Sequence, residues 1–271
     1  MIKQAIIPLA GLGTRLLPLT SVFAKELLPI NGKPGIEYIL DECIEAGIKE
    51  IVFIISTKKL MIKKYFYNDK FYKKIIKKKK DSRIINEYKK ILKYKKKIKF
   101  VFQNIPKGTG DAVLKTKKYI KSKYFLMLLP DDLIIKKNCS KTMIKVHQKY
   151  NASVMASMKV KKNNVSRWGI YKINKKLSKR NYIIDGVVEK PSAKKAPSNN
   201  AVIGRYILPR SIFNKIKSLK PKRGKEVHIT DAIQLLINDK EKFIAHNFEG
   251  KYLDCGTMNG YINSSIEIGK L

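Results

Sequence analysis

Acidic side chains are scarce in this sequence. Its 271 residues include 21 Asp and Glu against 59 Lys and Arg, which gives a formal net charge of +38. Such a charge commonly indicates a nucleic-acid or anionic-membrane partner. Lysine, however, is spread through nearly every segment beside an excess of isoleucine and asparagine, a pattern that we attribute to A/T-rich coding at tolerant surface positions. We therefore expect no specific nucleic-acid partner, and only loose polyanion binding at low salt.

Cysteine and histidine are also few. Cys43, Cys139 and Cys255 are an odd number without C-x-x-C spacing, which is typical of free thiols in a reducing cytosol. The three histidines are scattered and have no metal-ligand spacing. Neither residue type predicts a disulfide framework or a zinc site.

Long apolar runs are missing as well. No stretch reaches the roughly 18 residues that a membrane span needs, and the N-terminus lacks a charged region followed by a long apolar segment. We expect a cytoplasmic protein without a membrane partner. The apolar content of 44% can fill a real core, so we expect one large α/β domain over residues 1–271.

The most informative stretch is residues 3–34. A short apolar strand at residues 5–9 is followed without a spacer by Ala10, Gly11, Leu12 and Gly13. Glycine lets a polyphosphate approach the backbone, because it has no Cβ and its N–H groups can point at phosphate oxygens. Arg15 follows the loop and Lys25 lies ten residues further on, so two cations could neutralise a triphosphate.

Two common phosphate-binding motifs are absent from this loop. No Gly-Lys-Ser or Gly-Lys-Thr closes it, which excludes a P-loop. The third glycine of G-x-G-x-x-G is missing, which excludes the dinucleotide fingerprint. Because glycine loops also occur in ordinary strand-to-helix turns, this loop alone does not establish phosphate binding.

The following segments predict a strand-helix-strand unit. Residues 35–47 carry apolar side chains at helical spacing and end at Gly47, and residues 51–55 (IVFII) read as a strand buried on both faces. Such a unit opens a doubly wound sheet. The lysine-dense residues 58–99 also contain aromatics; we expect a helical excursion with its aromatics packed inward, rather than a nucleic-acid surface.

Two further motifs lie at predicted strand ends. A strand ends at Gln103, and Gly108 and Gly110 open a helix where backbone donors could reach a base or phosphate. The strand at residues 124–130 is followed by Asp131, placed to hold Mg²⁺ because ligands bind outside the carboxyl ends of strands in open α/β sheets. Helix-start and turn roles remain open for both.

Three motifs in the second half are ambiguous when taken singly. Gly169 follows Trp168, and a later strand ends in Glu189 and Lys190. Glu189 could accept hydrogen bonds from sugar hydroxyls and Lys190 could reach a sugar phosphate, or the two residues could simply be a charged strand end. A helix is expected over residues 224–236, with Thr230 or Asp231 near its cap. Asp254 precedes a glycine turn and is either a second metal carboxylate or the cap of the last helix.

The order of these motifs resembles that of the sugar-1-phosphate nucleotidylyltransferases. Lys25-Glu26, rather than Lys-Gln, resembles the bacterial UTP:glucose-1-phosphate uridylyltransferases in particular. The resemblance covers the whole chain and implies a Rossmann-like mixed, mostly parallel sheet flanked by helices, without an added C-terminal solenoid domain. It implies UTP and glucose 1-phosphate as substrates, Mg²⁺ as cofactor, and assembly as a dimer or tetramer.

The resemblance also implies roles for individual residues. Arg15 would bind the departing pyrophosphate, Lys25 the triphosphate and Lys190 the sugar phosphate. The Mg²⁺ ligands would be Asp131 and Asp254. The nucleotide would contact Ala10, Gly11, Gly13, Glu26, Gln103 and Gly108. Gly169 and Glu189 would hold glucose.

The sequence departs from the family pattern at two positions. Lys107 stands where an apolar residue is common, and Asp111 where histidine is common. Two other functions fit the same residues: a thymidylyltransferase using dTTP, against which Glu26 argues, and a polyanion-binding protein derived from such an enzyme.

Overall fold

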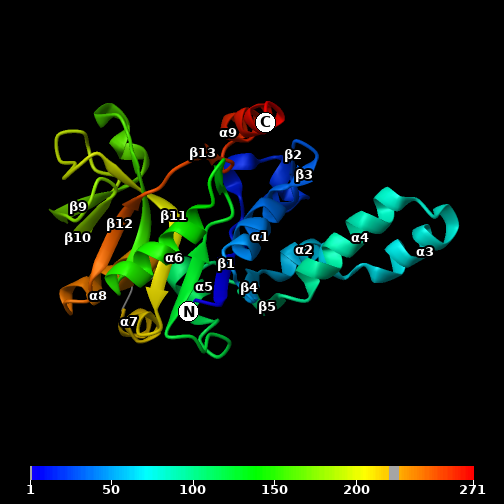
Figure 1. Cartoon of the computed structure of the whole chain (residues 1–271), viewed down its shortest axis with the longest axis horizontal. Coiled ribbons are helices and arrows are strands. Elements are labelled where there is room, and N and C mark those ends of the chain that lie inside the picture. The colour runs from blue at the N-terminus through cyan, green and yellow to red at the C-terminus, as the bar shows by residue number, and fades with distance from the viewer. Residues whose placement is uncertain (1, 220–225) are drawn as a thin grey trace.

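A nine-stranded mixed sheet forms the centre of the computed structural model, which describes residues 2–219 and 226–271 (Figure 1). In spatial order its strands are β5 (Ile98–Phe102), β4 (Glu50–Ile55), β1 (Gln4–Pro8), β6 (Tyr124–Leu128), β11 (Asn200–Pro209), β8 (Ser153–Lys159), β12 (Phe243–Asn247), β10 (Asn181–Glu189) and β9 (Gly169–Lys176).

The sheet changes character at β11. The strands β5, β4, β1 and β6 are mutually parallel, whereas β11 runs antiparallel to both β6 and β8. β12 is parallel to β8, and β10 is antiparallel to β12 and β9. β9 also pairs with β11 at one residue pair, Ile170 and Ala201, so the last five strands curl back on themselves. The mixed α/β fold is confirmed; parallel neighbours predominate only in its first half.

Helices cover both faces of the sheet. One face is covered by α1 (Gly35–Glu45), α2 (Leu60–Tyr67), α4 (Ser82–Lys95), α6 (Cys139–Tyr150) and α9 (Met258–Gly269). The other is covered by α5 (Thr109–Leu114), α7 (Ile212–Ser218) and α8 (Ile229–Asn238). Phe53 of β4 packs into the first core and Ile54 into the second, which explains why that strand is apolar without alternation.

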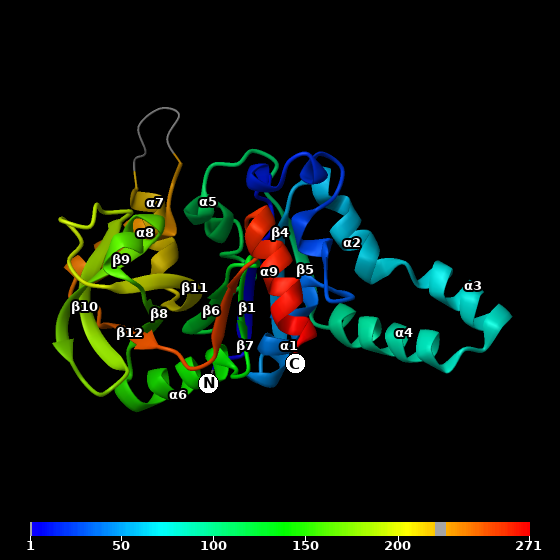
Figure 2. The same cartoon turned by 90° about the horizontal axis from the view of Figure 1, so that it is seen from above.

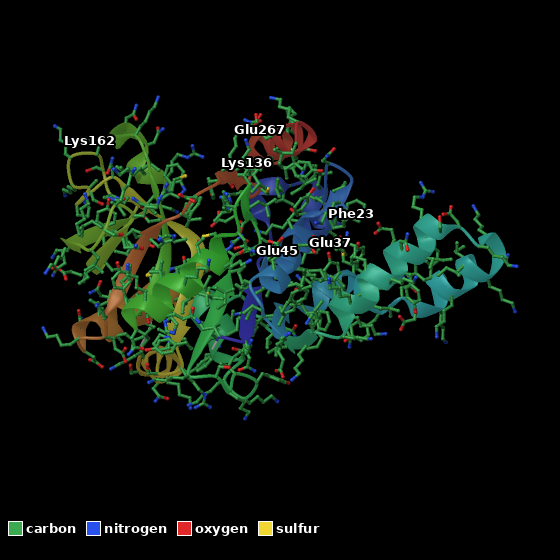
Figure 3. The ribbon with its side chains drawn as sticks, viewed as in Figure 1. Phe23, Glu37, Glu45, Lys136, Lys162 and Glu267 are labelled. Carbon is green, nitrogen blue, oxygen red and sulfur yellow. The ribbon has the colours of Figure 1, made fainter. Side chains whose placement is uncertain are left out.

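The lysine-dense segment is a helical arm made of α2, α3 (Asp69–Lys79) and α4, which projects from the body (Figures 1 and 2). No residue of α3 is buried. The base of the arm is tied to the buried Glu37 of α1, labelled in Figure 3, which accepts a 2.5 Å hydrogen bond from Tyr65 and pairs with Lys90. Its aromatics therefore do face inward at the base, where Phe66 and Tyr94 join the core.

Two short strand pairs position loops beside the sheet. β13 (Lys251–Asp254) runs antiparallel to β7 (Asp132–Ile135), and β2 (Pro29–Ile30) pairs with β3 (Lys33–Pro34). Among the described residues, no helix is both long and apolar enough to cross a membrane.

One predicted helix start needs correction, and one of the two roles left open for Asp254 is excluded. α8 begins at Ile229, because His228 has the extended backbone of a cap; Thr230 and Asp231 already lie in the first turn, and residues 224 and 225 fall outside the described part. The last helix is capped by Thr257, whose Oγ1 accepts from Gly260 N at 3.2 Å, so Asp254 is not its cap.

A buried histidine on β12 gives a testable pH dependence. The neutral ring of His246 bonds through Nδ1 to Asn181 Oδ1 at 2.8 Å, and burial, with Arg180 nearby, lowers its pKa to about 4. The unfolded state therefore binds a proton that the folded state excludes, so this stability is present above about pH 6.5 and is lost as pH falls toward 4.

We expect the difference in unfolding free energy between wild type and His246→Asn to fall by about 3 kcal/mol from pH 7 to pH 4. Asparagine keeps a donor near the Nδ1 position but does not titrate. Urea denaturation of both proteins at each pH measures this difference. The comparison with the variant is needed because burial raises the pKa of Asp132 to about 6, so the contribution of Asp132 to stability rises as pH falls and would mask that of His246 in the wild type alone. A pH-independent difference would contradict this account of His246.

Candidate active site

The predicted glycine loop directly follows β1. Ala10 and Gly11 leave the strand, and Gly13 adopts a φ of 72°, a conformation that L side chains rarely take. A 3-10 turn, Thr14–Leu16, then begins and presents Arg15, while Thr20 Oγ1 closes the loop with a 2.9 Å bond to Gly13 O. This turn places Arg15 beside Asp131, which follows the end of β6.

A cavity of about 280 Å³ lies beside this loop. Seven predicted site residues line it, from four separate parts of the chain: Ala10, Gly11, Lys25, Glu26, Gln103, Gly108 and Asp131. Glu226 also lines it, from the segment just before α8. The cavity sits at the carboxyl ends of β1 and β6, where an open α/β sheet binds its ligands.

Asp131 is held between the two predicted cations. Its Oδ2 lies 2.8 Å from Lys25 Nζ and 3.2 Å from Arg15 Nη2. Burial opposes the charge of both Asp131 and Lys25, but their mutual attraction prevails, so the pKa of Asp131 is lowered and that of Lys25 is raised. Asp131 and Lys25 are therefore both charged at neutral pH, and Lys25 and Arg15 share one carboxylate oxygen.

Backbone pairing brings Asp254 to the same place. Asp254 of β13 lies opposite Asp132 of β7, and Cys255 N donates to Asp131 O at 2.8 Å. A Cβ on Gly256 would lie 2.7 Å from Arg15 Nη2, 2.9 Å from Asp131 Oδ2 and 3.1 Å from Asp254 Oδ1. Both carboxylates therefore flank Gly256, and any side chain there would intrude between them.

These two carboxylates fit a magnesium ion that also binds substrate. In the part of the chain that the structure describes, no cluster of three or more His, Cys, Asp or Glu could hold a metal. Mg²⁺ commonly takes one or two carboxylates and completes its shell with phosphate oxygens and water. Asp131 and Asp254 supply such hard oxygen donors. Arg167 Nη2 lies 3.8 Å from Asp254 Oδ2.

Glu26 forms a buried ion pair at one wall of the cavity. Both of its carboxylate oxygens accept from Lys59 Nζ, at 2.8 and 2.9 Å. Burial lowers the pKa of Lys59, and the adjacent Glu26 only partly offsets this effect. The sequence did not single out Lys59, because it lies at the start of the lysine-rich segment.

Gln103 is held by the turn that opens α5. Its Nε2 donates to Asp111 Oδ2 at 2.7 Å and to Gly108 O at 3.2 Å. Gly108 has a φ of 94°, and a Cβ there would lie 2.4 Å from Val227 O. Gly110 N donates to Val227 O at 2.8 Å, so this donor serves the chain itself.

The predicted sugar-phosphate residues lie together, but they do not line the cavity. A Cβ on Gly169 would lie 3.2 Å from Glu189 Oε2, and Lys190 Nζ is 3.9 Å from Glu189 Oε1. β11 connects this group to the cavity. Its Ala201 lies opposite Ile170, and its Gly204 N donates to Asp132 Oδ2, three residues or ~10 Å further along. The side chain of Lys190 is 65% exposed.

A fully buried arginine supports the loop that carries Asp131. Arg205 of β11 donates to both carboxylate oxygens of Glu42, at 2.8 to 3.1 Å. It also donates to the carbonyls of Leu129, Gly204 and Asp132, at 3.1, 3.0 and 2.6 Å. Sequence reasoning missed this residue, since nothing in a strand's apolar pattern marks a buried charge.

Replacing Lys59 by methionine tests the buried pair. Lys59→Met leaves Glu26 buried without its cation, so we expect the free energy of unfolding to fall by about 3 kcal/mol, measured by urea denaturation. The exposed neighbour gives the control, Lys58→Met, which should change stability by less than about 0.5 kcal/mol. Adding Glu26→Gln to Lys59→Met should restore most of the loss; a single-variant loss under about 1 kcal/mol would argue against the pair.

Comparison with known proteins agrees with the motifs. A family model described as nucleotidyl transferase matches residues 4–270. A Streptococcus pyogenes serotype M3 protein named UTP--glucose-1-phosphate uridylyltransferase 2 is 36% identical over 278 residues, which cover 98% of this chain and 90% of that protein.

Solved structures of similar proteins superpose over nearly the whole chain. A UDP-glucose pyrophosphorylase complexed with UDP-glucose has a TM-score of 0.86 at 36% identity, covering 100% of this chain and 99% of the other. A UTP-bound UGPase from Acinetobacter baumannii has a TM-score of 0.91 at 32% identity, covering 99% and 94%. The resemblance inferred from the motifs is confirmed, and the chain belongs to the nucleotidyl transferase family.

Proposed function

We propose that this protein transfers a uridylyl group from UTP to glucose 1-phosphate, giving UDP-glucose and pyrophosphate. The observation that carries the proposal is the Asp131 carboxylate shared by Arg15 and Lys25 at the mouth of the glycine loop. The relatives' names and the titles of the solved structures support the identity of the substrates.

The reaction is a direct in-line displacement. A phosphate oxygen of glucose 1-phosphate attacks the α-phosphorus of UTP, and the bond from that phosphorus to the bridging oxygen of the β-phosphate breaks. The electron pair leaves with pyrophosphate. Because no covalent enzyme intermediate is needed, the side chains have to position two anions and neutralise their charge.

Arg15 and Lys25 act by exchanging partners. A triphosphate lying along the backbone of Gly11 and Gly13 offers these cations more negative charge than one carboxylate does. Arg15 then holds the β- and γ-phosphates that leave as pyrophosphate, and Lys25 the oxygens nearer the α-phosphorus. The exchange releases the Asp131 carboxylate for other ligands.

Asp131 and Asp254 would hold Mg²⁺ in this enzyme. The ion, when bound, supplies charge neutralisation on the phosphate oxygens. Lys190, at the end of β10, would bind the attacking phosphate of the sugar, with Gly169 and Glu189 holding glucose. Lys190 is exposed and its amine is not engaged by a close carboxylate, at 3.9 Å from Glu189, so it is available to a phosphate.

The nucleotide base would lie between Glu26 and Gln103, next to Gly108. Both residues line the cavity, and Glu26 is fixed there by Lys59. The charge of Lys59 is offset there by Glu26. The triphosphate would instead be drawn to Arg15 and Lys25, which share the single carboxylate of Asp131.

Pyrophosphate release from a panel of nucleoside triphosphates and sugar 1-phosphates tests the function. We expect the highest kcat/KM with UTP and glucose 1-phosphate. A clear preference for dTTP would replace the proposal by a thymidylyltransferase. Absence of release with every pair, together with nucleic-acid binding at physiological salt, would replace it by polyanion binding.

The role of Lys190 is tested by truncation. Lys190→Ala should lower kcat/KM about a hundredfold, because one charge partner of the reacting phosphates is lost. Its Tm should not change, since the side chain makes no buried contact. The matched control is the exposed neighbour, Lys194→Ala, which should keep full activity. Near-native turnover of Lys190→Ala would reject the assignment.

The role of Asp254 is tested through the metal. Asp254→Asn retains an oxygen that can accept from Gly256 N but loses the charge. We expect the Mg²⁺ concentration for half-maximal rate to rise by at least about tenfold. An unchanged magnesium requirement, measured as pyrophosphate release over a Mg²⁺ titration, would show that Asp254 does not bind the metal.

A further inference from the structure

Asp111 is a hydrogen-bond partner of Gln103, the residue that would contact the base. Gln103 is 5% exposed and lines the nucleotide cavity, whereas Asp111 lines a separate hollow on the outer side with Phe102, Asn104 and Lys107. Asp111 therefore reaches the cavity only through the 2.7 Å bond that it accepts from Gln103 Nε2.

The orientation of the Gln103 amide is chemically determined. Its terminal nitrogen faces Asp111 Oδ2 and Gly108 O, and both of these groups only accept hydrogen bonds. If the amide were turned by half a rotation, an oxygen would face two acceptors. Asp111 carries the negative charge of the pair, so its bond to Gln103 is the stronger of the two.

The opposite end of the amide is then an acceptor. Both protons of Nε2 are used, and no donor within the described residues reaches Gln103 Oε1. Uracil presents an N3–H donor on its Watson–Crick edge, whereas cytosine presents a bare N3 acceptor. An oxygen fixed in this direction accepts from uracil N3–H and repels cytosine N3.

We propose that Asp111 is a specificity-determining residue, which sets the Gln103 amide so that its oxygen selects uracil over cytosine. The inference rests on the proposed function for the identity of the base. It also gives a role to a position that departs from the family pattern. Thymine has the same N3–H, so Asp111 does not separate UTP from dTTP.

A purely structural role for Asp111 makes a different prediction. Asp111 lies in the first turn of α5, where an acidic side chain favours the helix, and Lys115 Nζ lies 3.9 Å from its Oδ2. Loss of that role alone would lower stability or activity equally for every nucleotide. Selective change of the ratio between two nucleotides separates the two roles.

The experiment compares Asp111→Leu and Asp111→Ala, which remove the acceptor, with Asp111→Asn, which keeps an acceptor but not the charge. Pyrophosphate release with glucose 1-phosphate gives kcat/KM for UTP, CTP and dTTP. We expect the UTP-to-CTP ratio to fall about tenfold or more in the first two variants, and to stay within about threefold in Asp111→Asn. The UTP-to-dTTP ratio should not change in any of them.

Each other outcome has a distinct meaning. An unchanged UTP-to-CTP ratio in folded Asp111→Leu and Asp111→Ala would overturn the inference while leaving the proposed function intact. If the wild type releases no pyrophosphate, the proposed function fails, and calorimetric binding of UTP and CTP to the same variants still decides whether Asp111 sets base preference. If either Asp111→Leu or Asp111→Ala has a Tm far below that of the wild type, the other of these two variants is used for the comparison.

Discussion

The arrangement of the candidate site depends on one buried guanidinium. Arg205 is fully buried, and its donors are shared between the Glu42 carboxylate and the main-chain carbonyls of Leu129, Asp132 and Gly204, the first two on either side of Asp131. A buried charge of this kind is tolerated only when it is paired and its hydrogen bonds are made. Ser140, at the start of α6, donates to the same Glu42. One ion pair thus joins α1, α6, β11 and the loop that carries Asp131.

Next to that support, two cations are paired with the one carboxylate of Asp131, and substrate phosphates can replace this carboxylate as their partner. Asp131 holds Arg15 and Lys25 in place before any phosphate arrives, so the cations do not have to be ordered during binding. Glu26, the residue next to Lys25, also lines the cavity and is neutralised separately by Lys59. Arg15 and Lys25 are therefore the cations of this site that a triphosphate can recruit from Asp131, whereas Lys59 stays paired with Glu26.

The sequence predicted the parts of the site that depend on local pattern. Gly11 and Gly13 follow a strand, and Asp131 ends one, so periodicity and turn chemistry place them at one edge of the sheet. Lys59 and Arg205 could not be found in this way. Their partners are distant in the chain, and one more lysine among 59 Lys and Arg carries no information. The bond from Gln103 to Asp111 spans eight residues, but it requires the turn at Gly108 to be known.

The return of β9 to β11 has a consequence for how copies of this chain meet. An edge strand offers unpaired backbone to a neighbouring molecule, whereas a strand that pairs on both sides does not. In the described part of the chain, β9 pairs on both sides only near its start, at Ile170, whereas β5 pairs along one side alone. Lys99 projects from β5 into solvent and pairs with Glu50 on the adjacent strand. A charge at that position discourages intermolecular sheet extension along β5 and so protects the protein against aggregation through this edge.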